Sequence, residues 1–320
     1  ALNGMLQALD PHSSYMNEEV FKEMQEDTSG TFGGLGIEIT TDKGFIKIIS
    51  PIDDTPADKA GIQAGDYITH LNGDSVVDMN LKEAIDIMRG EVGTSITLTI
   101  IRGTEEPFDV ELIRDTIKMA SVKHRVLNDV GVLRVSTFNE QTTSGLKDSI
   151  QELEESENPP IGYVLDLRNN PGGLLTESVS VSDLFLEQGE IVSIRGREKK
   201  DVQVFSAKKG DLINQKPLVV LINEGSASAS EIVAGALQDH DRAVIMGMKS
   251  FGKGSVQTIV PIDSGAIRLT IAKYYTPSGD SIQAVGIEPD VVVPRAELNI
   301  IDNYFTFRES DYQDALDNET

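Results

Sequence analysis

Two short segments carry the residue types that could catalyse hydrolysis. Residues 224–231 read EGSASASE and place three serines between an apolar, strand-like run and a helical pattern. Residues 251–257 read FGKGSVQ, with a lysine between two glycines and a glutamine four residues later. A serine needs a base before it can attack a carbonyl carbon, and a buried lysine with a lowered pKa can be that base. The two segments together predict a Ser–Lys hydrolase rather than a Ser–His–Asp one.

The three serines compete for the role of nucleophile. Ser226, Ser228 and Ser230 all lie where a predicted strand ends and a predicted helix begins. Free backbone N–H groups and the helix dipole stabilise negative charge at such a junction. Each serine is close enough to qualify, so spacing alone does not choose among them. Those that are not the nucleophile are expected to pack or to cap the helix.

Lys253 can accept a proton only when its amine is neutral, so we expect burial to lower its pKa. The glycines on either side of it let backbone and substrate approach closely. Gln257 can hydrogen-bond the amine without adding a negative charge, which would raise the lysine pKa.

The histidines do not suggest the rival Ser–His–Asp arrangement. The chain has four, His12, His70, His124 and His240, and none lies in a triad-like motif. No His/Asp/Glu cluster has the spacing of metal ligands, and no phosphate-binding loop of the P-loop type occurs. The sequence therefore predicts neither a metal nor a cofactor.

Composition narrows the class of protein. The chain has 320 residues, consistent with two or three domains, and 28 basic against 52 acidic residues give a net charge of −24. That acidity argues against nucleic acid as a partner, and no apolar run is long enough to predict a membrane span.

The absence of cysteine excludes disulfides and suits an oxidising compartment such as a periplasm. The first residues read neither as a signal peptide nor as a native start, so we expect any targeting segment to be missing.

The order of predicted elements divides the chain. Residues 1–28 predict polar helices with a turn at Asp10, and residues 35–113 predict short strands with one helix, Leu81–Met88, capped by Asn80. After about residue 117, strands alternate with helices, which is typical of βαβ units and a largely buried sheet. The strands expected there are 130–135, 161–168, 217–222, 268–274 and 291–293, and the helices are 142–155, 174–186 and 231–239.

Residues 35–113 resemble a PDZ domain. The supporting segments are the GLGI loop at 34–37, the stretch PADKAGIQAGDYI at 56–68 and the Asn72-Gly73 turn. Successive N–H groups in the tight glycine turn would hold the carboxylate of a peptide C-terminus. The resemblance implies that Gly34, Leu35, Gly36 and Ile37 bind the peptide, which would pair along the strand that follows.

Nearly the whole chain resembles the carboxyl-terminal processing proteases, also called tail-specific proteases. The motifs, in order, are LDPHS at 9–13, the PDZ-like module, LDLRNNPGGL at 165–174, GSASASE at 225–231, GKGSVQ at 252–257 and GIEPD at 286–290. The resemblance implies an α/β multidomain fold in which a β-rich PDZ-like module precedes a crotonase-like ββα catalytic core. We expect an N-terminal helical segment at 1–29, the PDZ domain at 30–116, the protease core at 117–294 and a tail at 295–320.

The same resemblance assigns the catalytic roles. The middle serine, Ser228, is the implied nucleophile, with Lys253 as base and Gln257 as its orienting partner. We expect the oxyanion hole to use the backbone N–H of Ala229, which follows the nucleophile, and that of Gly172 or Gly173.

The resemblance implies cleavage near the C-terminus of flexible protein substrates, with the PDZ-like module holding the tail. We expect the module to gate the site by moving about hinges at Gly30–Gly34 and Asp115–Met119. Arg89 is the candidate for a charged contact between module and core.

Partners and cellular location are also expectations from the sequence. An adaptor or activator protein is a possible partner, and the N-terminal helix and the acidic tail could assemble a homo-oligomer. The resemblance implies a periplasmic or other bacterial envelope location, with a plastid lumen as the alternative. Two other functions compete: a catalytically silent PDZ adaptor on a protease scaffold, and a crotonase-like enzyme that acts on acyl-CoA.

Overall fold

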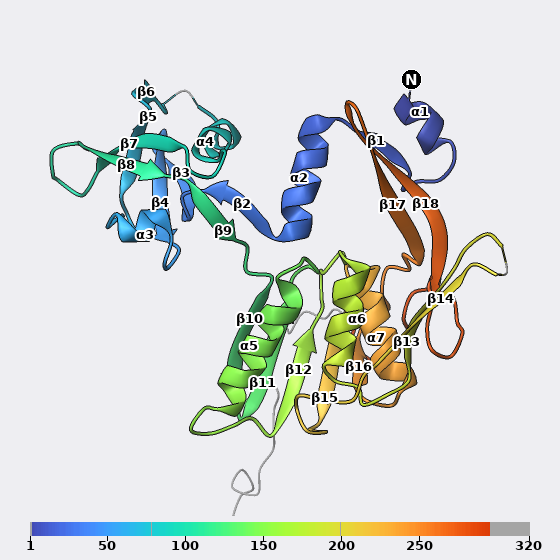
Figure 1. Cartoon of the computed structure of the whole chain (residues 1–320). Helices are drawn as coiled ribbons and strands as arrows, with labels where there is room; N and C mark the ends of the chain where they lie inside the picture. The colour runs from blue at the N-terminus through green and yellow to red at the C-terminus, as the bar shows by residue number, and fades with distance from the viewer. Residues whose placement is uncertain (1, 78, 199, 295–320) are drawn as a thin grey trace, which may run out of the picture.

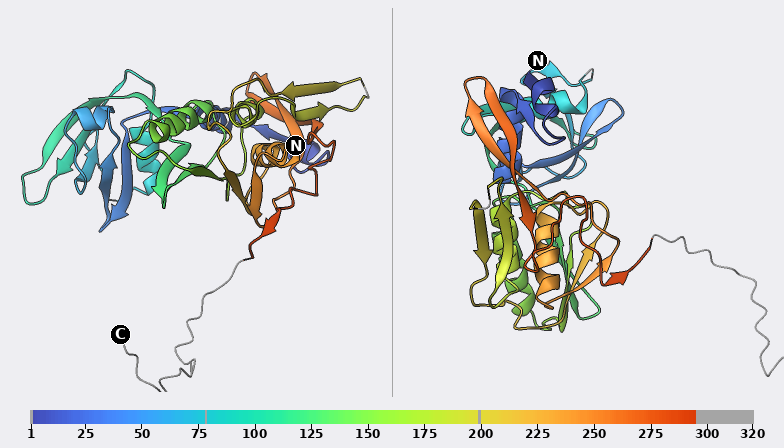
Figure 2. Two further views of the ribbon diagram at one scale, coloured as in Figure 1. Left: turned by 90° about the horizontal axis from the view of Figure 1, so that it is seen from below. Right: turned by 90° about the vertical axis from the view of Figure 1, so that its right-hand side faces the viewer.

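The computed structural model describes residues 2–77, 79–198 and 200–294. It is elongated, with the PDZ-like module at one end and the α/β core towards the other (Figure 1; Figure 2, left). The expected tail at 295–320 lies outside the described residues. No helix among the described residues is long and apolar enough to cross a membrane.

The PDZ-like module is built on one antiparallel sheet with strand order β3-β4-β5-β7-β8 and β6 paired to β5. Residues in β7 alternate between buried and partly exposed positions, which gives the sheet one face for a core. Helix α4 begins after Asn80, the cap that the sequence predicts, and the structure adds a reciprocal capping box between Asn80 and Glu83. The bounds are β3 Ile37–Asp42, β4 Phe45–Pro51, α3 Pro56–Lys59, β5 Tyr67–Leu71, β6 Asp74–Ser75, α4 Leu81–Met88, β7 Ser95–Ile101 and β8 Phe108–Ile113.

The two segments expected to be hinges form one structure. Strand β2 (Thr31–Gly34) enters the module, strand β9 (Asp115–Lys118) leaves it, and the two pair antiparallel. A paired ribbon resists independent movement of its strands, because they share backbone hydrogen bonds. Any movement of the module relative to the core therefore bends the ribbon as a unit or occurs at its ends.

The core contains a second sheet with strand order β10-β11-β12-β15-β16-β19. Strands β11 to β19 of this order run parallel and β10 is antiparallel to β11. Helices α5, α6 and α7 lie against one face of the sheet (Figure 1). The bounds are β10 Val122–Leu127, β11 Val130–Val135, α5 Thr142–Glu154, β12 Gly162–Asp166, α6 Leu175–Asp183, β15 Leu218–Ile222, α7 Ala229–Asp239, β16 Val244–Gly247 and β19 Val291–Val292.

A third sheet brings the N-terminal segment onto the core. Its order is β1-β18-β13-β14, and β17 also pairs with β18. Helix α7 contacts both β13 and β16, so it lies between this sheet and the parallel one, and Ala229–Leu237 are buried. The bounds are α1 Leu2–Gln7, β1 Ser14–Met16, α2 Glu18–Ser29, β13 Glu190–Arg195, β14 Val202–Ser206, β17 Ser255–Ile262 and β18 Gly265–Tyr275.

The N-terminal segment differs from the helical prediction because of this pairing. Strand β1 has only three residues and lies antiparallel to β18, with Ser14 opposite Arg268. Three residues are too short for a recognisable alternation, so only contact with β18 makes them a strand. The pairing places the preceding turn at Asp10–Ser13 beside Lys253 and Gln257.

Candidate active site

The three candidate serines have different surroundings in the structure. Ser226 Oγ donates to Leu167 O at 2.8 Å and Ser230 Oγ donates to Asn170 O at 2.9 Å, and both serines are fully buried. Each of these hydroxyl protons is therefore already used in a hydrogen bond to a backbone carbonyl. Ser228, in contrast, lines a cavity of about 510 Å³ that lies among β17, β18 and the N-terminal segment. The geometry favours Ser228 as the nucleophile.

Ser228 is the residue that precedes α7, and its backbone is unusual. Its φ of 55° and ψ of −110° lie in a region that residues other than glycine rarely adopt. Such strain persists only where the surroundings enforce it. It turns the chain sharply from the loop after β15 into α7, and Ser228 lines the cavity at the start of that helix. The N–H groups of Ser230 and Glu231 already donate to Ala227 O and Ser228 O.

The buried carboxylate of Glu231 holds this turn against the lysine loop. Glu231 Oε2 accepts from Ser228 N at 2.7 Å and from Lys253 N at 2.9 Å. Its Oε1 accepts from Ser250 Oγ and from Gly252 N, both at 2.6 Å. One side chain thus fixes the backbone of both proposed reacting residues. Glu231 was not among the predicted site residues, although a serine followed three residues later by glutamate is a capping-box pattern.

Lys253 lines the same cavity as Ser228, and its amine has a defined position. Lys253 Nζ donates to Gln257 Oε1 at 2.8 Å and lies 3.5 Å from Ser255 O. Burial lowers the pKa of Lys253, the positive charge of Arg268 lowers it further, and Glu231 opposes both. Burial and a neighbouring cation both favour the neutral amine, which is the form that can accept a proton.

Tyr274 is a further neighbour of Ser228 that the sequence did not indicate. It lines the cavity from β18. Burial raises the pKa of Tyr274 to about 12, and a hydrogen bond with Ser228 acts in the opposite direction. The phenol is therefore neutral at physiological pH and can hold the Ser228 side chain without adding charge.

The two glycines predicted for the oxyanion hole are not equivalent. Gly172 packs directly on the turn at Ser228, since a Cβ there would lie 2.9 Å from Ser228 Cβ, and its N–H donates to Asn170 Oδ1 at 2.9 Å. Gly173 lines the cavity beside Ser228. Because the Gly172 N–H is already used, the geometry favours Gly173 together with Ala229, the first residue of α7.

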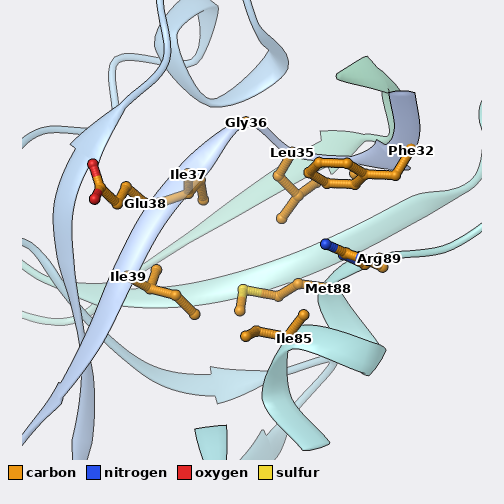
Figure 3. A pocket seen from close by; sticks show the side chains of 10 residues that line it. Phe32, Leu35, Gly36, Ile37, Glu38, Ile39, Ile85, Met88 and Arg89 are labelled. Carbon is orange, nitrogen blue, oxygen red and sulfur yellow. The ribbon is translucent and has the colours of Figure 1, made fainter. Parts of the chain in front are cut away.

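The predicted peptide site is a groove between β3 and α4 with a volume of about 270 Å³ (Figure 3). The predicted residues Gly34, Leu35, Gly36 and Ile37 all line it. Apolar side chains of α4, Ile85 and Met88, face them across the groove (Figure 3). The lining suits an extended peptide with apolar side chains.

Comparison with protein families decides the identity of this chain. Residues 129–293, which hold the whole Ser–Lys cluster, match the model of peptidase family S41, and residues 47–102 match a PDZ domain. The chain belongs to peptidase family S41. The predicted family, the serine protease class and a fold in which the PDZ domain precedes the protease core are confirmed.

Curated relatives of this S41 chain carry names of the same kind. The carboxy-terminal-processing protease of Bartonella bacilliformis is 58% identical over 297 residues, which are 92% of this chain and 68% of the relative. Carboxy-terminal processing protease CtpA of Bacillus subtilis is 38% identical over 317 residues, which are 97% of this chain and 67% of the relative. The chain thus spans about two thirds of the length of these relatives.

A solved structure gives the same answer for the fold. The photosystem II D1 C-terminal processing protease is 32% identical and has a TM-score of 0.55, with 91% of this chain and 80% of that chain covered. Neither competing function, the silent adaptor or the acyl-CoA enzyme, gains support from these comparisons.

The structure places Arg89 in the PDZ groove of this S41 protease rather than against the protease core. Arg89 follows α4, lines the groove and lies 4.1 Å from the ring centroid of Phe32 (Figure 3). Its Nη1 lies 3.3 Å from Glu26 Oε2 in α2, and the two side chains are 40% and 23% exposed. The contact therefore joins the groove to the helix that leads back to β1.

His12 was not among the predicted site residues, but it lies in the cavity of the candidate site. It lines the cavity with Ser228 and Lys253, because β1 carries the N-terminal turn onto β18. Burial lowers the pKa of His12, the positive charges of Lys253 and Arg268 act in the same direction, and Asp10 opposes them. The sequence feature that could have indicated His12 is the LDPHS motif at 9–13. The other three histidines contact Thr69, Glu152 and Glu190 instead.

Proposed function

We propose that this S41 protease is an endopeptidase that cleaves proteins near their C-termini by a Ser–Lys mechanism. Ser228 is the nucleophile, Lys253 is the general base and Gln257 orients the lysine. The observation that carries the proposal is one cavity that contains both the strained Ser228 turn and a buried amine held by Gln257 at 2.8 Å.

The proposed reaction begins with a proton transfer. Lys253 Nζ takes the hydroxyl proton as Ser228 Oγ bonds to the scissile carbonyl carbon. The carbonyl oxygen becomes an oxyanion, to which the N–H groups of Ala229 and Gly173 donate. The Lys253 ammonium then protonates the leaving amine as the C–N bond breaks, which leaves an ester on Ser228. Lys253 next deprotonates a water molecule that hydrolyses the ester and restores the hydroxyl.

The PDZ domain is proposed to select the substrate. Its groove takes an apolar C-terminal segment, and the loop at 34–37 holds the terminal carboxylate. The polypeptide upstream of the tail can then reach the cavity at Ser228. In this scheme residues 1–29 connect the two sites, residues 30–116 bind the tail and residues 117–294 cleave. Residues 295–320 are the proposed C-terminal tail.

The first test of this function is where the cleavage falls. We expect a flexible protein that ends in apolar residues to lose short C-terminal peptides, identified by mass spectrometry. The same protein with several aspartates added at its C-terminus is the matched control, because the groove is apolar and the chain is strongly acidic. Cleavage at the same sites and rates in both proteins would contradict tail selection.

The PDZ domain is also proposed to gate the site, with Arg89 as the regulatory contact. Replacing Arg89 by alanine removes both its ion pair with Glu26 and its stacking on Phe32. Because such partly exposed contacts contribute about 0.5–1 kcal/mol, we expect peptide activation of turnover to change by about 2- to 5-fold. Turnover is measured with and without an activating C-terminal peptide.

Two comparisons make the Arg89 measurement decisive. Glu26→Gln should produce a change in the same direction, because it removes the partner on α2. Lys82→Ala, on the same helix α4, is the matched control for loss of a positive charge. If Arg89→Ala leaves both basal turnover and peptide activation unchanged, Arg89 has no part in gating.

The cellular setting is proposed on similarity and composition. A bacterial periplasm or cell envelope agrees with the bacterial relatives and with a chain that lacks cysteine. A plastid lumen is the alternative. Partners beyond protein or peptide substrates are proposed to include an adaptor or activator protein, and a second copy of the chain.

A further inference from the structure

The side-chain amide of Gln257 has two polar ends, an oxygen and an NH₂, and each end hydrogen-bonds to different residues. Its Oε1 accepts from Lys253 Nζ at 2.8 Å. Its Nε2 donates to Ser255 Oγ at 2.9 Å and to Thr270 Oγ1 at 3.2 Å. The oxygen and the NH₂ of an amide have nearly the same shape, so only hydrogen-bond partners decide which end faces the lysine.

The partner that decides the direction lies in the N-terminal turn. Thr270, on β18 beside Gln257, donates its single hydroxyl proton to Asp10 Oδ1 at 2.9 Å. An ionised carboxylate only accepts, so Thr270 Oγ1 must accept from Gln257. Ser255 cannot impose a direction in this way, because its hydroxyl can donate or accept.

Asp10 is held in place and kept ionised. Burial raises its pKa, but hydrogen bonds from Ser13, from His12 N and from Thr270 outweigh burial and lower the pKa of Asp10 to about 2. Thr270 N also donates to Ser13 Oγ at 3.1 Å, and Ser14 next to it begins the pairing of β1 with β18. The carboxylate is thus fixed to the strand that carries Thr270.

We propose that Asp10 and Thr270 are positioning residues for the catalytic lysine. They orient the Gln257 amide so that its oxygen, and not its NH₂, faces Lys253. The inference rests on the proposed Ser–Lys mechanism. With the amide reversed, the NH₂ would donate to the Lys253 lone pair, which is the electron pair that must take the Ser228 proton. The N-terminal segment therefore helps to position the proposed base, although Asp10 and Lys253 are 243 positions apart in the sequence.

The test uses two substitutions at Thr270. Thr270→Val keeps the shape and removes the hydroxyl, while Thr270→Ser keeps the hydroxyl and removes a methyl group. Losing the orienting hydrogen bond should lower kcat about 10-fold in Thr270→Val, whereas Thr270→Ser should keep at least about half of the parent kcat. Thr258→Val, on the paired strand β17, is the matched control and should leave kcat unchanged.

A structural role for Thr270 is separated from an orienting role by repeating Thr270→Val in a Gln257→Ala background. If Thr270 acts through Gln257, Thr270→Val should not lower kcat further in the Gln257→Ala background, because the amide that it orients is already absent. An equal loss in both backgrounds, or a Thr270→Val protein as active as the parent, would overturn the inference and leave the Ser–Lys mechanism standing. Full activity of Gln257→Ala alone would instead overturn the proposed role of Gln257 and the inference with it.

Discussion

Replacing Lys253 by alanine is expected to lower kcat by about 10⁴- to 10⁶-fold, and Ser228→Ala should cost about as much. The reason is that neither group is useful alone. Ser228 holds its proton without a base, and Lys253 has no bond to form with the substrate. The double variant should therefore be no slower than either single variant. Release of a C-terminal peptide from a flexible, apolar-tailed protein measures these rates.

The controls for this experiment are available in the same chain. Lys249 lies in the same loop region but pairs with Glu288 at 2.9 Å and is half exposed, so Lys249→Ala should keep the parent kcat. Binding of an apolar peptide to the PDZ domain should be unchanged in every variant, which reports an intact fold. Equal cleavage by the parent, Ser228→Ala and Lys253→Ala would mean that a different nucleophile or a contaminating protease is responsible.

A substitution at Gly173 should have the second largest effect. Gly173 has a φ of 144°, and a Cβ there would lie 2.1 Å from the carbonyl oxygen of Phe138. Gly173→Ala must therefore shift the loop that carries the proposed oxyanion donor. Removing one such donor costs about 10²- to 10³-fold in kcat, so a loss of that order is expected, with KM changed much less.

Backbone strain alone must be separated from the loss of the donor. Gly61 also has a positive φ, 75°, but no atom lies within 4 Å of the Cβ that an alanine would add. Gly61→Ala should lower the melting temperature somewhat and leave kcat unchanged. A Gly173→Ala protein that folds, binds peptide and keeps at least half of the parent kcat would remove Gly173 from the proposed oxyanion hole.

Elements with a local signal were predicted well from the sequence. Helix α4 has the predicted bounds, and its start has a local cause, because Asn80 and Glu83 cap it within a single turn. Strand β11 likewise has the predicted bounds, because it is a short, mostly apolar run that lies between two neighbouring strands and buries every second residue. Strands β1, β2 and β9 were missed, since each is three or four residues long and exists only through a distant partner. The core strands β10, β13, β14, β16 and β17 were not predicted either.

The sequence by itself determined the family of this protein and pointed to its proposed chemistry: a serine run, a glycine-flanked lysine, a glutamine four residues on and a PDZ domain before them, in the order of an S41 protease. These are local patterns, and residue types at short spacing are enough to define them. Tertiary structure alone decided which serine opens to the cavity and which glycine faces it. It also decided that His12 lies in the site and that Asp10 meets Thr270. Those relations depend on β1 pairing with β18 across more than 250 residues. Contacts of that kind arise from packing of the whole chain, and no short stretch of sequence encodes them.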